Sequence, residues 1–252
     1  MSFSIANAQK SPWIYIHYPI CQHHCSYCDF NVVARTRSPQ DFESVWLSAL
    51  RTHLVSLKNS PRVRLEGLYL GGGTPSLVSP KTFSELFACL RDLYDWTSET
   101  EVTIECNPEN LTYEHLASLR DLGVNRPSLG IQTTVPHQLK RLERLSTSKH
   151  IFNAVEWLSD LFSNYSLDLM IGIPDQTLES LEVDLDFVRN IRPPHISVYL
   201  LTLDDEHKLK TNAYMKSRLA NADLASKMYE KVCEALSALG YLHYEVSNFS
   251  KP

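Results

Sequence analysis

The sequence predicts an α/β protein whose parallel strands form a partial (β/α)6 barrel. Short apolar runs rich in β-branched and aromatic residues alternate with longer segments whose apolar residues recur at helical spacing. Six such repeats follow one another, which gives parallel strands joined by right-handed crossovers. A polar segment comes after the sixth strand, so a full eight-fold barrel fits the chain less well. In either form ligands bind where the strands end, so the residues after each apolar run are expected to face the site.

The first two repeats occupy residues 13–94. Residues 13–19 (WIYIHYP) are short and rich in strand-forming residues. Residues 41–57 carry apolar residues near helical spacing. Residues 66–73 (EGLYLGGG) form a buried-strand pattern that ends in glycines, and residues 79–94 open with a serine and a proline suited to a helix start.

The next repeats reach residue 174. Residues 101–108 (EVTIECNP) alternate as a strand does, and residues 112–123 predict a helix that ends at a glycine. Residues 126–132 (RPSLGIQ) predict the fourth strand. Two helical stretches follow between residues 136 and 162, and residues 166–174 (SLDLMIGIP) predict the fifth strand.

The last part of the chain predicts a helix at 178–191 and a strand at 195–203. A long helix is expected at about 222–239, ending before a glycine, and residues 242–246 are expected to form a last strand. We therefore expect one domain over residues 1–252, with the barrel at about 12–203 and a polar segment with its helix at 204–252.

The composition is that of an ordinary globular protein, with 43% hydrophobic and 21% charged residues among 252. The formal net charge of -5 argues against nucleic acid or an anionic membrane as the main partner, because both favour a basic surface. No run is long and apolar enough to span a bilayer, and the first residues lack the pattern of a secretory signal. We expect a cytoplasmic protein whose thiols stay reduced.

Three of the six cysteines lie in one short stretch, as Cys21, Cys25 and Cys28 with the spacing C-x3-C-x2-C. The other three are scattered and are expected to pack as small apolar residues. Thiolates bind zinc or an iron–sulfur cluster. Zinc needs a fourth ligand, for which His23 or His24 is a cramped choice. A [4Fe–4S] cluster on three cysteines keeps one iron open to a substrate, and this is the favoured interpretation.

Polar residues at the ends of the strands are further candidates. Glycines at the end of the second strand let a ligand approach the backbone closely, and a tight turn between strand and helix is the alternative explanation. Glu105 and Asp168 lie within apolar strands, where a carboxylate is costly unless it is paired. Either an internal partner or a cationic ligand would account for them.

The cysteine spacing directly after a first strand resembles the signature of radical S-adenosylmethionine (SAM) enzymes. The resemblance implies a [4Fe–4S] cluster whose fourth iron is chelated by the amino and carboxylate groups of SAM. An electron from the cluster then cleaves SAM to give a 5'-deoxyadenosyl radical. It also implies a partial (β/α)6 barrel, as the strand count does.

Seven motifs, in order, resemble the oxygen-independent coproporphyrinogen III oxidase group over nearly the whole chain: YIHYPIC, CDFN, GGGTPSLV, TIECNPE, SLGIQ, DLMIGIP and HYEVSNFSKP. This resemblance implies that Tyr27 packs near the SAM adenine. It also implies SAM contacts for Tyr15, Gly72, Gly73, Thr74, Glu105, Gln132, Arg144 and Asp168.

Position 30 distinguishes the branches of this group. The resemblance implies that an oxidase would have the pattern C-x3-C-x2-C-x-C, with a fourth cysteine at the position that Phe30 occupies here. CDFN instead resembles the heme chaperone branch, the HemW-type proteins, which bind heme and deliver it to respiratory targets. That resemblance implies three partners: heme or a porphyrin, a heme-accepting protein and an electron donor. The branch continues into a C-terminal domain with a heme-binding H-N-x-x-Y-W stretch; residues 204–252 reach only the start of that region, in truncated form. Thr133 and Thr134 also depart from the usual Ser-Phe.

Two other functions stay open at this point. One is a radical SAM oxidoreductase that acts on a porphyrinogen such as coproporphyrinogen III, against which the residue at position 30 weighs. The other is a zinc-stabilised binding module without radical chemistry.

Overall fold

The parallel sheet expected from the repeats is present in the structure, a computed structural model that describes residues 11–58, 61–203, 206–207, 209 and 216–252. Six strands run parallel in the order β1, β4, β5, β6, β7, β8. Their bounds are Trp13–Tyr18, Gly67–Gly72, Glu101–Cys106, Arg126–Gln132, Ser166–Ile171 and His195–Leu200. The order follows the chain and β1 does not pair with β8. The fold is therefore the predicted partial (β/α)6 barrel.

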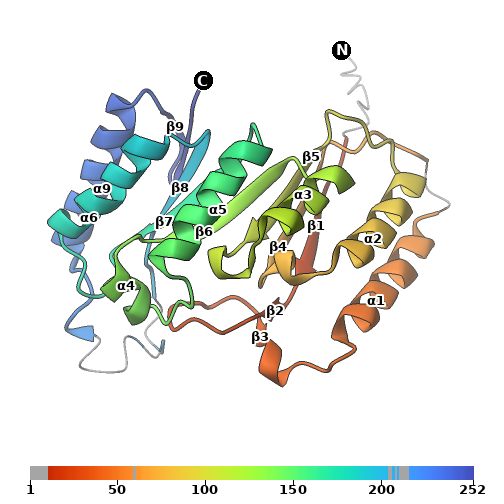
Figure 1. Cartoon of the computed structure of the whole chain (residues 1–252), viewed down its shortest axis with the longest axis horizontal. Coiled ribbons are helices and arrows are strands. Elements are labelled where there is room, and N and C mark those ends of the chain that lie inside the picture. The colour runs from red at the N-terminus through yellow and green to blue at the C-terminus, as the bar shows by residue number, and fades with distance from the viewer. Residues whose placement is uncertain (1–10, 59–60, 204–205, 208, 210–215) are drawn as a thin grey trace, which may run out of the picture.

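Helices cover one face of the sheet, as Figure 1 shows. They are α1 (Phe42–Ser56), α2 (Pro80–Leu93), α3 (Tyr113–Leu122), α4 (Pro136–Arg141), α5 (Ser148–Leu161), α6 (Leu178–Ile191) and α9 (Ala222–Ala238). Short 3-10 helices occupy Arg35–Arg37, Pro75–Leu77 and Pro108–Asn110. Ser79 caps α2 as the sequence predicts, since its hydroxyl accepts from the Thr82 backbone N–H.

The two faces of the strands differ in chemistry. Leu68 and Leu70 of β4 are buried and belong to the main core, whereas Tyr69 between them points to the inner face of the barrel and bonds to Glu105. On β7, Leu167 and Leu169 likewise belong to the main core. The inner face thus carries the polar side chains, and the apolar core lies between sheet and helices.

The C-terminal part of the chain contains two strands, whereas the sequence predicts one. β9 (Leu242–Glu245) is the expected strand, but β10 (Asn248–Ser250) follows it and inserts between β8 and β9, antiparallel to both. A second small sheet pairs β2 (Ile20–Cys21) with β3 (Val33–Ala34) on either side of the cysteine cluster. The sequence does not predict β2, β3 or β10, because strands of two or three residues are too short to show a hydrophobic period.

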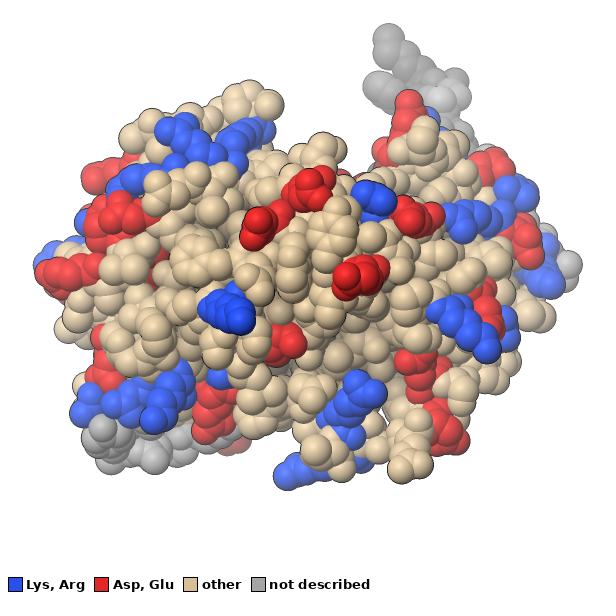
Figure 2. Space-filling view, viewed as in Figure 1, with Lys and Arg blue, Asp and Glu red and all other residues tan. Residues whose placement is uncertain are grey.

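The surface gives no large patch of one charge on the face that Figure 2 shows, where Lys and Arg side chains are interspersed with Asp and Glu. Among the helices in the described ranges, none is long and apolar enough to cross a membrane.

Candidate functional site

A cavity of about 360 Å³ lies at the carboxyl ends of the parallel strands. The loop after β1 forms one wall, and the ends of β4 to β8 form the rest. Ten of the twelve residues predicted from the sequence line it: Cys21, Cys25, Tyr27, Cys28, Gly72, Gly73, Glu105, Gln132, Arg144 and Asp168. Strand ends distant in sequence therefore meet at one site, as expected for this architecture.

The segment that carries Cys21, Cys25 and Cys28, here called the cysteine loop, is held by strand pairing and by hydrogen bonds. Cys21 ends β2, which pairs with β3. In the middle, the Ser26 backbone N–H and hydroxyl donate to the carbonyls of Leu142 and Arg141, at 3.3 and 3.2 Å. The Cys28 N–H donates to the Cys25 carbonyl at 3.3 Å. The loop is thus fixed against the last residue of α4 and the residue that follows it.

All three cysteines carry free thiols and are partly buried. Burial raises the pKa of Cys21 to about 11 and raises the pKa values of Cys25 and Cys28. Arg144 and the Thr74 hydroxyl act in the opposite direction, because they favour thiolates. A bound metal centre would supply the remaining positive charge that deprotonates such thiols. Nowhere in the described ranges do three His, Cys, Asp or Glu side chains gather closely enough to hold a single ion.

Gly72 and Gly73 bring the end of β4 against the cysteine loop. Gly72 has a φ of 114°, a left-handed conformation that side chains disfavour. A Cβ on Gly73 would lie 2.6 Å from the Ile20 carbonyl oxygen. The Gly73 N–H donates to the Tyr18 carbonyl at 2.7 Å, and the Thr74 N–H donates to that of Ile20 at 2.9 Å. These glycines therefore allow the close approach of backbone that places Cys21.

Glu105 lies in the cavity wall with both carboxylate oxygens occupied. Oε1 accepts from the Tyr69 hydroxyl at 2.9 Å, and Oε2 accepts from the Gly72 N–H at 2.9 Å. Burial raises the pKa of Glu105 despite these bonds, and Asp168 adds to the rise. A cationic ligand group would offset the cost of holding this buried charge.

Asp168 faces the same cavity from β7. Its carboxylate accepts from the Ser128 hydroxyl at 3.1 Å and from that of Ser166 at 3.3 Å. Burial raises its pKa, and the serine hydroxyls only partly counteract this. No cation is within ion-pair distance of either carboxylate among the described residues. The hydrogen-bond partners of both carboxylates are thus neutral groups, so neither charge is balanced by a direct ion pair among the described residues.

Arg144 is the buried cation of the site, and its side chain is only 4% exposed. Nη2 donates to the Gly130 carbonyl at 2.6 Å and to Asn107 Oδ1 at 3.0 Å. Nη1 lies 4.0 Å from the Cys25 sulfur, and Glu109 lies 3.8 Å from Nη2. Nε has no partner in the structure. The guanidinium is thus placed to favour negative charge on the cysteine loop.

The remaining predicted residues have different surroundings. Gln132 ends β6 with a φ of 63°, after a shift of register between β6 and β7. Tyr27 packs against the small cluster of Leu142, Met170 and Ile173. Thr74 is buried behind the cavity wall, where its hydroxyl accepts from Asn107 at 2.9 Å. Tyr15 is not among the residues that line the cavity; it is 58% exposed, and its ring stacks on that of Tyr69 with centroids 5.9 Å apart.

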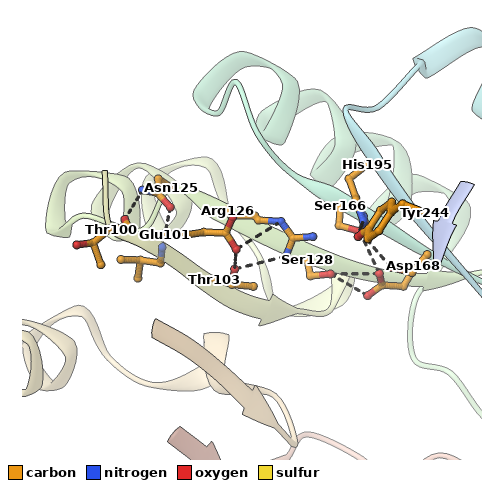
Figure 3. A network of polar contacts seen from close by, with 12 residues as sticks. Thr100, Glu101, Thr103, Asn125, Arg126, Ser128, Ser166, Asp168, His195 and Tyr244 are labelled. Carbon is orange, nitrogen blue, oxygen red and sulfur yellow. Dashed lines mark hydrogen bonds and ion pairs between the residues drawn. The ribbon is translucent and has the colours of Figure 1, made fainter. Parts of the chain in front are cut away.

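A row of polar contacts crosses the inner face next to the cavity (Figure 3). In one group the Arg126 guanidinium donates to Thr103 at 3.4 Å, and in the next group along the face Ser128 donates to Asp168. Beyond Ser166, His195 bonds to the Ser166 hydroxyl at 2.8 Å and to the Tyr244 hydroxyl at 2.7 Å. Burial lowers the pKa of His195 to about 4, so the imidazole is neutral near pH 7. The row fixes Asp168 and ties the strand β9 to the barrel.

Sequence reasoning missed several residues that complete the site. Asn107 joins Thr74 to Arg144, and Ser128 and Tyr69 bond to the two carboxylates. Asn107 stands in the quoted motif TIECNPE, directly after the strand, where the architecture predicts ligand-facing residues. Ser128 lies two residues before Gly130 and four before Gln132 on the same strand, and this alternation is the signal that could have found it.

The chain resembles known proteins along almost its full length. A model of the Radical SAM superfamily matches residues 15–188. The chain is 35% identical over 247 residues to the heme chaperone HemW of Lactococcus lactis, covering 97% of this chain and 63% of that protein. It is 34% identical over 242 residues to the HemW of Bacillus subtilis, covering 94% and 63%. The solved structure of coproporphyrinogen III oxidase (HemN) from Escherichia coli superposes with a TM-score of 0.87 at 24% identity, covering 98% of this chain and 57% of that one.

Proposed function

We propose that this chain, which belongs to the radical SAM superfamily, is the core of a heme chaperone that holds a [4Fe–4S] cluster and SAM. The family resemblance inferred from the cysteine spacing is confirmed, and the family implies both groups. The chain spans about 63% of the length of the curated relatives that it matches. Heme handling and its partners are therefore proposed for this chain on the strength of that likeness.

The cysteine loop fits the cluster in the kind and number of its donors. Cys21, Cys25 and Cys28 offer three thiolates, which leave one iron open for the amino and carboxylate groups of SAM. Arg144 favours the thiolate form of Cys25, from which it lies 4.0 Å. Bound together, the cluster and SAM supply reductive cleavage of a carbon–sulfur bond, for which no side chain has the chemistry.

The cavity residues are proposed to bind and orient SAM. Glu105 and Asp168 have neutral protein partners and raised pKa values, so they are suited to the ammonium and the ribose hydroxyls. The glycines at the end of β4 expose backbone beside them. Gln132, Arg144, Thr74, Tyr27 and Tyr15 are proposed contacts by the resemblance, and Tyr15 would act from the open rim.

The observation that carries the chaperone assignment is the likeness to HemW proteins over 94–97% of this chain, together with Phe30 at the cavity. Phe30 is 65% exposed and occupies the position where the oxidase signature has a further cysteine. The similarity in fold to the oxidase, at 24% identity, is expected for a heme chaperone and for an oxidoreductase alike, so it does not distinguish the two functions.

Two measurements test the proposal. We expect the anaerobically reconstituted chain, supplied with SAM and dithionite, to leave coproporphyrinogen III unchanged. Robust formation of protoporphyrinogen would contradict the chaperone assignment and support the oxidoreductase alternative.

Heme titration addresses the chaperone role directly. We expect saturable heme binding by this chain, followed by the Soret band, and weaker binding than by the longer Lactococcus lactis relative. Absence of saturable binding by this chain, with binding by the relative, would show that the core does not hold heme.

A further inference from the structure

We propose that Tyr244 and His195 are positioning residues, which orient a hydrogen bond that Asp168 receives at the SAM cavity. They do so by fixing the direction in which the Ser166 hydroxyl donates its single proton. This inference rests on the proposed function, in which the Asp168 carboxylate accepts hydrogen bonds from SAM. It also gives a role in the site to the motif HYEVSNFSKP, which contains Tyr244 and which the proposed function leaves unused.

These four residues form one hydrogen-bonded chain that joins β7, β8 and β9 (Figure 3). The Ser166 hydroxyl lies 3.3 Å from Asp168 Oδ1 and 2.8 Å from His195 Nδ1. His195 Nε2 lies 2.7 Å from the Tyr244 hydroxyl. Asp168 lines the SAM cavity, whereas Tyr244 is 61% exposed. The chain therefore leads from the cavity to the surface of the molecule.

Ser166 is the link at which the direction of the chain matters, because a serine hydroxyl has one proton to donate. Two acceptors, Asp168 Oδ1 and His195 Nδ1, lie within 3.3 Å of it, and the Ser197 hydroxyl is more distant at 3.5 Å. An unprotonated Nδ1 would take the proton and leave Asp168 without this donor. A protonated Nδ1 donates to the Ser166 oxygen instead, and the hydroxyl proton is then directed to Asp168.

Tyr244 decides which ring nitrogen of His195 carries the proton. Burial lowers the pKa of His195 to about 4, so near pH 7 the neutral imidazole has one proton to place. The hydrogen bond at one ring nitrogen sets the tautomer of the other. A phenol is a far stronger acid than a neutral imidazole N–H, so the Tyr244 hydroxyl donates to Nε2. The ring proton is thereby placed on Nδ1, beside Ser166.

This orientation matters for Asp168 because serine hydroxyls are the direct partners of its carboxylate. Burial raises the pKa of Asp168, and each donated hydroxyl proton favours the ionised form. The ionised carboxylate is the form that accepts from both hydroxyls of a ribose. Tyr244 is not among the residues that line the cavity, so it acts on the ligand through His195 and Ser166.

The tautomer of His195 can be measured without SAM. In the full chain with 15N-labelled histidine rings, we expect the nuclear magnetic resonance signals of an Nδ1–H imidazole, assigned from their loss in His195→Asn. Tyr244→Phe removes the donor to Nε2, so both tautomers should be populated in that variant. The matched control is Tyr113→Phe, because Tyr113 is an exposed tyrosine whose hydroxyl donates to Asp160 between α3 and α5. It should leave the His195 signals unchanged.

SAM titration of the reconstituted chain measures the consequence for the site. We expect Tyr244→Phe to bind SAM about two- to tenfold more weakly than the wild type, which corresponds to the loss of one hydrogen bond. Tyr113→Phe should keep the wild-type affinity. In a His195→Asn background, which has no ring nitrogen for the phenol, Tyr244→Phe should cause no further loss of affinity. A role of Tyr244 in stability alone would lower the thermal midpoint and leave the tautomer and the affinity unchanged.

Two results would overturn the proposal: an Nε2–H tautomer of His195 in the wild type, or a Tyr244→Phe variant that keeps the wild-type tautomer or SAM affinity. Thermal unfolding of each variant shows whether it is folded. Failure of the wild-type chain to bind SAM would contradict the proposed function. In that case the tautomer, which is read without SAM, decides the direction of the chain independently.

Discussion

Asp168 shows how a single residue links stability to ligand binding. Its carboxylate is held by the hydroxyls of Ser128 and Ser166, and burial raises its pKa. The folded protein therefore binds a proton here more readily than the unfolded chain does. Between the ordinary carboxyl pKa of about 4 and the raised folded value, the free energy of unfolding falls as pH increases.

Asp168→Asn should remove this penalty and weaken SAM binding. We expect the thermal midpoint of the variant to exceed that of the wild type at about pH 8 and to approach it at about pH 4. SAM affinity should fall by about tenfold or more, because a charge-assisted hydrogen bond is lost. Scanning calorimetry and SAM titration of the two proteins measure both effects.

The exposed Asp186→Asn serves as the control for this comparison, since Asp186 lies on α6 and pairs with Arg189 at the surface. A constant difference between Asp168→Asn and wild type at every pH would contradict the account of the buried charge.

Site residues of an unusual type or spacing could be predicted from the sequence alone. Glu105 and Asp168 were found because charges are rare in apolar strands, and the three cysteines because of their spacing. Asn107 and Tyr69 were not found, since an asparagine after a strand and a tyrosine within one are ordinary. Their roles depend on which strand ends become neighbours, and a single sequence does not carry that information.

The junction of β4 with the cysteine loop is decided at the scale of elements. A Cβ on Gly73 would contact the backbone of Ile20, next to Cys21. Gly73→Ala should therefore displace β2, lower the free energy of unfolding by about 1–3 kcal/mol and reduce the iron bound after reconstitution.

Gly240→Ala is the matched control for this variant. Gly240 has a φ of 84° and no atom near the added methyl, so alanine there costs stability through backbone strain alone. We expect it to keep the full iron content. Equal iron loss in both variants would show that general instability, and not the β4 junction, sets cluster loading.

The turn after β6 depends on a buried carboxylate of α6. Asp184 is 1% exposed, and its Oδ1 accepts from the Thr134 N–H at 2.6 Å and from the Thr134 hydroxyl at 2.7 Å. This bond anchors the turn directly after Gln132, at the cavity. The threonines that depart from the family's usual Ser-Phe thus have a structural partner here.

Asp184→Ala should leave a buried N–H without an acceptor and lower the free energy of unfolding by about 1–3 kcal/mol. SAM affinity should fall as well, because Gln132 is released. Chemical denaturation and SAM titration test this, with Asp186→Ala on the same helix as the exposed control. Unchanged stability of Asp184→Ala would contradict the anchoring role.

Elements with a clear period were predicted, and their ends were not. The strands expected at 166–174 and 195–203 stop earlier, at Ile171 and Leu200. The first stops because Gly172 turns the chain with a φ of 79°. The left-handed conformation of Gln132 and the antiparallel β10 likewise follow from tertiary contacts. The local hydrophobic period indicates which face of an element is buried. It does not indicate features that depend on contacts with residues distant in the sequence.

At the scale of the whole molecule, the polar inner face distinguishes this barrel from a closed, apolar one. The sheet stays open between β1 and β8, and its inner side holds the two carboxylates, Arg144 and the row that ends at Tyr244. The predicted extent of the barrel, about 12–203, ends near β8, whereas β9 and β10 continue the same sheet. We propose that residues 242–250 form part of the same domain as the barrel strands.

We propose above all that the three cysteines hold a [4Fe–4S] cluster whose open iron is bound by SAM in the cavity lined by Glu105 and Asp168. Electron paramagnetic resonance of the dithionite-reduced, anaerobically reconstituted chain, recorded with and without SAM, tests it most directly. We expect a cluster signal that shifts when SAM is added, and no cluster signal when Cys21, Cys25 and Cys28 are replaced by alanine. A cluster signal that SAM leaves unchanged, or one that persists without the three thiols, would contradict it.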